Sequence, residues 1–135
     1  MKALLLIAHG SRLPVANAEV VALCRRLAGR LAADFDLIDC AFLELAAPGI
    51  GAALDNCIDR GCQDITLLPY FLAPGRHIQD DIPAIMQEKR TRHPEVRITM
   101  APYLGQSARL LEVLAELAVA GPPGAKGGPS GPQPH

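Results

Sequence analysis

The sequence contains very few aromatic residues, with no Trp, two Tyr and three Phe in 135 residues. Half of the chain is nevertheless hydrophobic, so its interior must be built from Leu, Ile, Val and Ala. Aliphatic interiors of this kind are typical of parallel sheets covered by helices. The length fits one folded domain, and the composition excludes collagen-like and wholly disordered classes.

The chain also lacks any block of like charges and any long apolar run. Its 13 basic and 14 acidic residues give a net charge of −1, which favours neither nucleic acid nor an anionic membrane as a partner. The longest apolar opening, residues 3–8, is too short to span a bilayer or to form the core of a signal peptide. We therefore expect a cytoplasmic protein with no nucleic-acid partner and no membrane partner.

No C-x-x-C pair occurs among the four cysteines, Cys24, Cys40, Cys57 and Cys62, which lie in apolar stretches. We expect reduced thiols in or near the core, because a free cysteine packs as a small hydrophobe. A domain of this size also needs no disulfides. Cys57 and Cys62 are spaced for metal binding, but two ligands alone do not form a site.

Four apolar runs of strand length begin near residues 3, 37, 65 and 96, and a helical pattern follows each of them. This rhythm predicts an α/β fold with a four-stranded parallel sheet flanked by helices. The first and third runs are almost continuously apolar and should be central, whereas Asp39 interrupts the second and the fourth alternates. Right-handed crossovers then favour the strand order 2-1-3-4, as in one flavodoxin-like half.

The expected helices carry apolar residues at helical spacing, and Pro83 confines the regular part of the third helix to begin near Asp80 or Asp81. The four apolar stripes are Val20, Cys24, Leu27 and Leu31; Ile50, Leu54 and Cys57; Ile78, Ile82 and Ile85; and Leu110, Leu114 and Leu117. Residues 121–135 contain five Gly and five Pro and predict a disordered tail after a domain at 1–120.

Polar residues follow three of the expected strands, at the carboxyl edge where open parallel sheets bind ligands. His9 follows the first strand, Glu44 the second and the Gly75-Arg76-His77 segment the third. Two histidines can hold one divalent metal ion, and a nearby carboxylate can accept protons.

Less specific interpretations of the same residues are also open. Either histidine alone fits an ordinary loop or cap residue, and Glu44 fits a cap for the second helix, with Pro48 at its start. Gly10, Ser11 and Arg12 suit a phosphate at a helix N-terminus, but no G-x-G-x-x-G, P-loop or nucleophile-elbow sequence is present. His93 lies at a turn on the opposite edge and is expected to be solvated.

Three motifs in order resemble those of the sirohydrochlorin chelatases. They are Leu-Leu-Ile-Ala-His-Gly-Ser-Arg at 5–12, Phe-Leu-Glu at 42–44 with Pro48, and Leu-Pro-Tyr-Phe-Leu at 68–72, which leads to Gly-Arg-His-Ile at 75–78 and Asp-Asp-Ile-Pro at 80–83. The resemblance covers residues 1–120 and is to the short, single-lobe form of this family of cobaltochelatases and ferrochelatases.

The resemblance implies insertion of a divalent metal, cobalt, iron or also nickel, into sirohydrochlorin in cobalamin or siroheme biosynthesis, without an organic cofactor. It implies that His9 and His77 handle the metal and that Glu44 assists catalysis. Short members resemble half of a two-lobed chelatase, so a homodimer is expected. We also expect the carboxylate-rich substrate to contact four neighbouring residues, Ser11, Arg12, Gly75 and Arg76, with the arginines forming bidentate hydrogen bonds.

A second hypothesis is a non-catalytic carrier of metal or tetrapyrrole with the same fold, because a fold and its ligands do not prove turnover. Glu44 favours the enzyme, since a carrier has less use for a proton acceptor. A phosphate-handling α/β enzyme is a more distant third.

Overall fold

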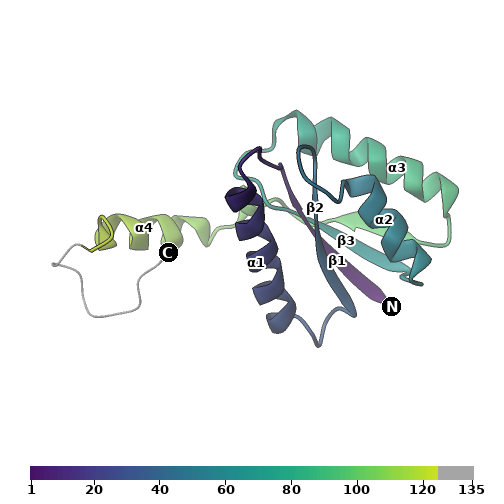
Figure 1. Cartoon of the computed structure of the whole chain (residues 1–135), viewed down its shortest axis with the longest axis horizontal. Helices are drawn as coiled ribbons and strands as arrows, with labels where there is room; N and C mark the ends of the chain where they lie inside the picture. The colour runs from purple at the N-terminus through teal and green to yellow at the C-terminus, as the bar shows by residue number, and fades with distance from the viewer. Residues whose placement is uncertain (125–135) are drawn as a thin grey trace.

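The computed structural model of the chain describes residues 1–124, apart from the side chain of His77. Four parallel strands form one sheet in the order β2-β1-β3-β4 (Figure 1). The strands are β1 (Lys2–Ala8), β2 (Leu37–Phe42), β3 (Asp64–Pro69) and β4 (Arg97–Met100). The predicted strand order is confirmed, including the central positions of the first and third strands.

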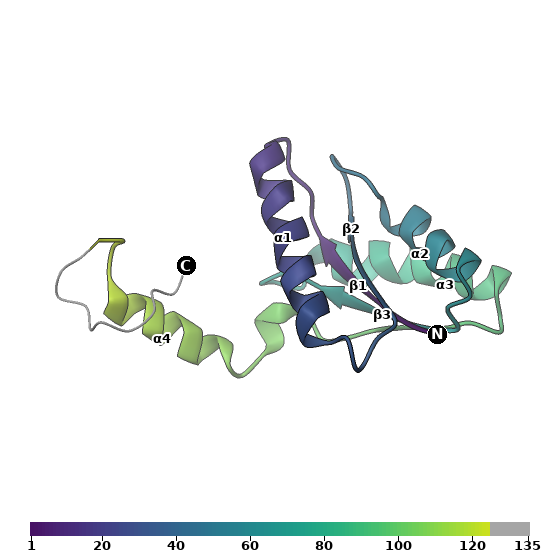
Figure 2. The ribbon, with the colours of Figure 1, turned by 60° about the horizontal axis from the view of Figure 1, so that its bottom comes forward.

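Helices lie on both faces of this sheet, with α1 on one side and α2 and α3 on the other (Figure 2). The helical elements are α1 (Pro14–Arg30), α2 (Ile50–Asp59), the π-helical turn η1 (His77–Asp81), α3 (Ile82–Arg92), the 3-10 turn η2 (Leu104–Gln106) and α4 (Leu110–Ala120). In the part of the chain that the structure describes, no helix is both long and apolar enough to cross a bilayer.

Two apolar clusters share β1, because its alternate side chains point to opposite faces of the sheet. Leu5 and Ile7 pack toward α2 and α3, while Leu6 and Ala8 pack toward α1. Each fully buried Leu or Ile side chain among them stabilises the fold by about 1.5–3 kcal/mol. The continuous apolar run at the start of the chain is therefore the centre of both clusters.

Pro83 shapes the start of α3. Its nitrogen carries no hydrogen, so it cannot donate the helical bond to the carbonyl four residues earlier. The chain instead forms the π-helical turn η1, and the α-helix begins at Ile82, close to the predicted start. Ile82 is fully buried against the sheet, as its place on the predicted stripe requires.

The fourth helix forms where the sequence predicts it but packs differently from the other three. No residue of α4 is buried, and Leu114 and Leu117 on its predicted stripe are 56% and 42% exposed. Figures 1 and 2 show α4 reaching away from the rest of the molecule. The predicted helix is therefore confirmed, but its apolar stripe is not buried in the structure. The predicted tail at 121–135 falls mostly outside the described residues.

All four cysteines are free and buried, as predicted. Burial away from water is the main cause that raises the pKa of Cys24 and of Cys57 to about 12, and it also raises the pKa of Cys40. The thiols of Cys24, Cys40 and Cys57 therefore resist ionisation and are unreactive, because thiolates are the nucleophilic and metal-binding form.

This shift makes stability depend on pH in the alkaline range. An unfolded thiol ionises near pH 9.0, whereas the buried Cys24 thiol keeps its proton up to about pH 12, so a rising pH favours the unfolded state. We expect the free energy of unfolding to fall by roughly 1.4 kcal/mol per pH unit for this thiol within that interval. Urea denaturation of Cys24→Ala should show a correspondingly smaller loss, and equal losses in both proteins would contradict the assignment.

Candidate functional site

The segments that leave β1, β2 and β3 are joined by main-chain hydrogen bonds at the carboxyl edge of the sheet. The Glu44 N–H donates to the His9 carbonyl at 3.1 Å, and the Tyr70 N–H donates to the Ile7 carbonyl at 2.8 Å. His9 and Glu44, which are far apart in the sequence, therefore lie on neighbouring main-chain segments at the edge where the sequence predicts a site.

Gly10 allows these two segments to approach so closely. Its φ is +95°, and a Cβ atom at this position would lie only 1.7 Å from the Glu44 carbonyl oxygen. Leu45, the residue after Glu44, also has a positive φ, of 65°. A side chain at residue 10 would force the two loops apart, so this glycine controls the spacing between His9 and Glu44.

The His9 ring is exposed at this edge, and its Nδ1 lies 3.2 Å from the Gly10 carbonyl oxygen. A carbonyl can only accept a hydrogen bond, so Nδ1 carries the hydrogen when this bond forms. In a neutral imidazole the lone pair is then on Nε2, the nitrogen that can ligate a metal ion.

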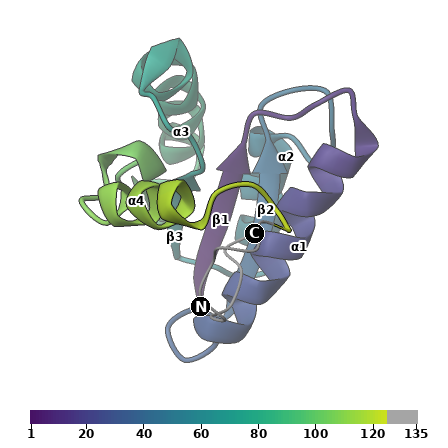
Figure 3. The same ribbon diagram turned by 90° about the vertical axis from the view of Figure 1, so that its left-hand side faces the viewer.

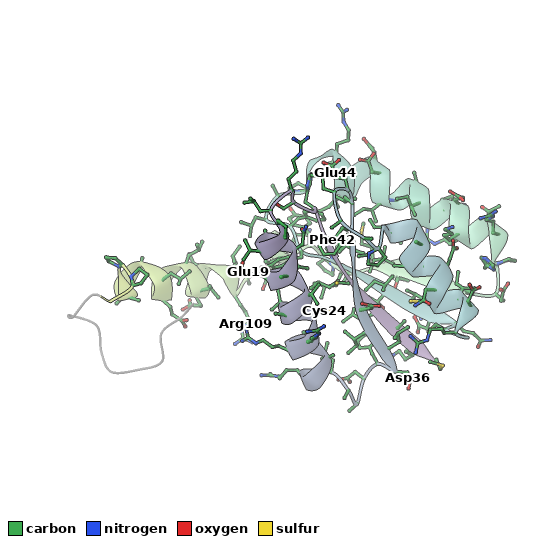
Figure 4. The ribbon with its side chains drawn as sticks, viewed as in Figure 1. Glu19, Cys24, Asp36, Phe42, Glu44 and Arg109 are labelled. Atoms are coloured by element: carbon green, nitrogen blue, oxygen red, sulfur yellow. The ribbon has the colours of Figure 1, made fainter. Side chains whose placement is uncertain are left out.

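Glu44 is also exposed, and it does not cap the second helix. The N-cap of α2 is Gly49, and no side chain forms a cap hydrogen bond there. Figure 4 shows Glu44 beyond one end of β2, with Asp36 at the opposite end. The helix-capping interpretation is therefore wrong, and the carboxylate is available at the candidate site.

The third predicted segment follows β3 and enters η1. Gly75 and Arg76 are exposed, and the backbone of His77 occupies the first position of η1. Among the described residues, no three His, Cys, Asp or Glu side chains are placed to hold a metal ion. The metal-handling pair of His9 and His77 stays a prediction, because it needs the His77 side chain.

Ser11 shapes the loop before α1 more than its sequence motif suggests. Its hydroxyl accepts a hydrogen bond from the Leu13 N–H at 3.1 Å. Asn17 clamps its backbone from both sides, accepting from the Ser11 N–H at 2.9 Å and donating to the Ser11 carbonyl at 2.7 Å. Arg12, next to this clamp, is exposed. Substrate contacts by Ser11 and Arg12 stay predictions.

Asn17 is not among the site residues predicted from the sequence, although one signal for it is present. Helix α1 begins at Pro14 after Leu13, which has no side chain that can cap a helix. An asparagine in the first turn of such a helix is a candidate to bond the preceding loop. His93, by contrast, lies at the opposite edge, where its half-buried ring is 3.7 Å from the Glu95 carboxylate.

The CbiX family model matches residues 3–120 of this chain. This chain belongs to the CbiX family. A sirohydrochlorin cobaltochelatase of Priestia megaterium is 31% identical over 84% of this chain, and a sirohydrochlorin ferrochelatase of the same organism is 32% identical over 86%. The chain spans only 36% and 43% of these two relatives. A sirohydrochlorin cobaltochelatase of Saccharolobus solfataricus is 33% identical, and the match covers 86% of this chain and 92% of that relative.

Solved structures support the CbiX family fold. SirB from Bacillus subtilis subspecies spizizenii, a sirohydrochlorin chelatase in complex with cobalt, aligns with a TM-score of 0.75 at 26% identity, over 85% of this chain and 48% of that one. A CbiX protein from Marinobacter aquaeolei VT8 aligns with a TM-score of 0.68 at 26% identity, over 86% of this chain and 92% of that one. This CbiX chain therefore matches about half of a SirB chain and almost all of the Marinobacter protein. The family predicted from the motifs is confirmed.

Proposed function

We propose that this chain inserts Co²⁺ or Fe²⁺ into sirohydrochlorin. The observation that carries the proposal is the main-chain junction of His9 and Glu44 at the carboxyl edge of a CbiX fold. The segment that contains His77 follows the adjacent strand β3. The relatives named as chelatases of cobalt and iron support the same reaction.

The chemistry needs a metal donor and a proton acceptor. Insertion strips water from the ion, transfers it to four ring nitrogens and releases two N–H protons. His9 and His77 supply neutral nitrogen ligands, which hold a divalent ion without the closed cage of a structural site. Glu44, on the adjoining loop, accepts a proton as the metal enters.

The proposal also covers which metal ions are inserted and where in the cell the reaction takes place. Imidazole suits cobalt, iron and nickel alike, so Ni²⁺ is a third ion to test. The reaction transfers the metal as a substrate and needs no organic cofactor. We place the protein in the cytoplasm, in cobalamin or siroheme biosynthesis.

Two copies of the chain form the working unit in this proposal. One sheet edge gives a single wall, whereas binding sites bury most of their ligand. A homodimer adds a second wall and doubles the arginines at positions 12 and 76, which are exposed and suited to the carboxylates of sirohydrochlorin. Exposed apolar side chains at Tyr70 and Leu72, in the loop after β3, provide a contact surface beside this site.

Anaerobic incubation with sirohydrochlorin and each metal tests the proposal. The absorbance change of the macrocycle is followed with the protein and in a protein-free blank, because metal ions also insert without a catalyst. We expect many turnovers per chain above the blank rate. Stoichiometric binding without acceleration would instead identify a carrier and contradict the enzyme assignment.

Glu44→Gln tests the proton acceptor, since it keeps the size of the side chain and removes its charge. We expect turnover to fall at least about 10-fold, because a positioned base contributes about 100-fold or more, while metal binding remains. Glu95→Gln is the matched control, since Glu95 lies at the opposite edge near His93. Equal turnover rates for Glu44→Gln and the parent protein would show that Glu44 is not the proton acceptor.

A further inference from the structure

The loop between β1 and α1 carries His9 at one end and Arg12 near the other. Figure 3 shows this loop leaving the end of β1 and passing over to the start of α1. The Arg12 side chain is exposed. No carboxylate among the described residues forms an ion pair with its guanidinium, and this includes Glu44 on the adjoining loop. The charge of Arg12 is therefore available to a ligand at this edge of the sheet.

Hydrogen bonds hold the main chain on both sides of Arg12. Before it, the Ser11 N–H donates to Asn17 Oδ1 at 2.9 Å, and the Ser11 carbonyl accepts from Asn17 Nδ2 at 2.7 Å. After it, the Leu13 N–H donates to the Ser11 hydroxyl at 3.1 Å. Because both neighbours are held, the Arg12 main chain has a defined position although its side chain is exposed.

Asn17 suits this task by its place in the helix and by its chemistry. It lies in the first turn of α1, and helical side chains tilt toward the N-terminus, so its amide reaches back to the loop. A carboxamide offers an acceptor and a donor side by side, as the N–H and the carbonyl of one residue require. Both bonds go to Ser11, so they stabilise the loop and not the end of the helix.

The two ends of this loop depend on different neighbours. At the His9 end, Gly10 lies against the Glu44 carbonyl in the loop after β2. At the Arg12 end, the partner is Asn17 in α1. Loss of the Asn17 amide should therefore loosen Arg12 and leave the contact between the His9 and Glu44 loops in place.

We propose that Asn17 is a positioning residue, which holds the main chain beside Arg12 so that the guanidinium meets a carboxylate of the macrocycle. The inference rests on the proposed function and assigns a residue that orients its substrate. The carboxylates lie at the periphery of the macrocycle, away from the ring nitrogens that receive the metal. Their contact with Arg12 is therefore the same before and during metal insertion, and such a contact lowers KM without raising kcat.

Asn17→Ala tests the proposal through substrate binding and through the kinetics of insertion. We expect the Kd for metal-free sirohydrochlorin and the KM to rise about 10-fold, because the loop must then be ordered when the substrate binds. The value of kcat should stay at that of the parent protein. Titration followed by the absorbance of the macrocycle gives the Kd. Glu19→Ala is the matched control, since Glu19 is exposed on the same helix and should leave both constants unchanged.

A double-mutant cycle tests whether Asn17 acts through Arg12. Arg12→Ala should itself raise the Kd for sirohydrochlorin. Adding Asn17→Ala to Arg12→Ala should raise the Kd no further, because the guanidinium that Asn17 positions is already absent. Multiplying effects of the two substitutions would show that Asn17 acts independently of Arg12 and would overturn the proposal.

Asn17→Asp provides a second variant of nearly the same size. Its carboxylate can accept from the Ser11 N–H but cannot donate to the Ser11 carbonyl, so we expect the Kd to rise as in Asn17→Ala. An unchanged Kd in both variants would overturn the proposal. So would a lower kcat with unchanged KM and Kd, which is the result of a merely structural role.

Binding and turnover fail separately in these experiments. A parent chain that binds sirohydrochlorin without metallating it would contradict the proposed reaction, and the Kd values would still decide the role of Asn17. A parent chain that metallates sirohydrochlorin, with an Asn17→Ala variant of equal Kd and KM, would contradict the role of Asn17 alone. A parent chain that does not bind sirohydrochlorin would overturn both.

Discussion

His9→Ala and His77→Ala are each expected to reduce the catalysed insertion rate at least about 100-fold, the usual cost of losing a group that acts on the reacting centre. His9 presents an exposed ring at the carboxyl edge, and His77 begins the turn that follows the third strand. Removing either imidazole leaves one nitrogen ligand where the proposal requires two. The measurement is the initial rate of sirohydrochlorin metallation above a protein-free blank.

The control for both substitutions is His93→Ala. His93 ends α3 at the opposite edge, so its loss should leave the rate at the parent value. His9→Ala should retain the thermal midpoint of unfolding, because an exposed ring beyond a strand end contributes little to the core. If His9→Ala and His77→Ala both insert metal at the rate of the parent protein, the assignment of these two histidines as the metal pair is wrong.

Gly10→Ala is expected to be the most disruptive small substitution at this edge. The new methyl group would lie 1.7 Å from the Glu44 carbonyl oxygen, at a residue whose φ is +95°. The loops of His9 and Glu44 must then move apart. We expect a loss of about 3 kcal/mol or more in the free energy of unfolding, from backbone strain and this clash together. Urea denaturation and the insertion rate measure the two effects.

Gly61→Ala is the control that separates the cost of a positive φ from the cost of the clash with Glu44. Gly61 has nearly the same φ, +92°, but nothing lies within 4 Å of the position that a Cβ atom would take there. We expect a loss of about 1–2 kcal/mol, the cost of a left-handed conformation, with an unchanged insertion rate. If Gly10→Ala lowers the free energy of unfolding no more than Gly61→Ala does, then the close contact between the His9 and Glu44 loops does not contribute to stability.

The strand order could be predicted because apolar continuity reports burial on both faces. Residues 3–8 have no polar interruption, which suits only a strand with neighbours on each side and helices on each face. The ends of parallel strands then meet at one edge, so the meeting of the His9 and Glu44 segments also followed from the sequence.

The packing of α4 could not be predicted in the same way. Its apolar spacing shows that the helix has a side to bury, but spacing does not say which surface covers that side. The direction of α4 depends on contacts of η2 with Phe71 and Leu72, which are more than 30 residues earlier in the chain. The Asn17 clamp and the Gly10 contact likewise depend on neighbours that only folding brings together.

The sequence by itself determined the α/β class, the strand order, the buried thiols and the edge that holds the candidate site. These features depend on local periodicity and on rules of connection that act along the chain. Only the tertiary structure decided that Glu44 leaves α2 uncapped, that Gly10 sets the gap between two loops, and that no residue of α4 is buried. Each of these depends on distances between segments that are far apart in the sequence, which no periodicity encodes.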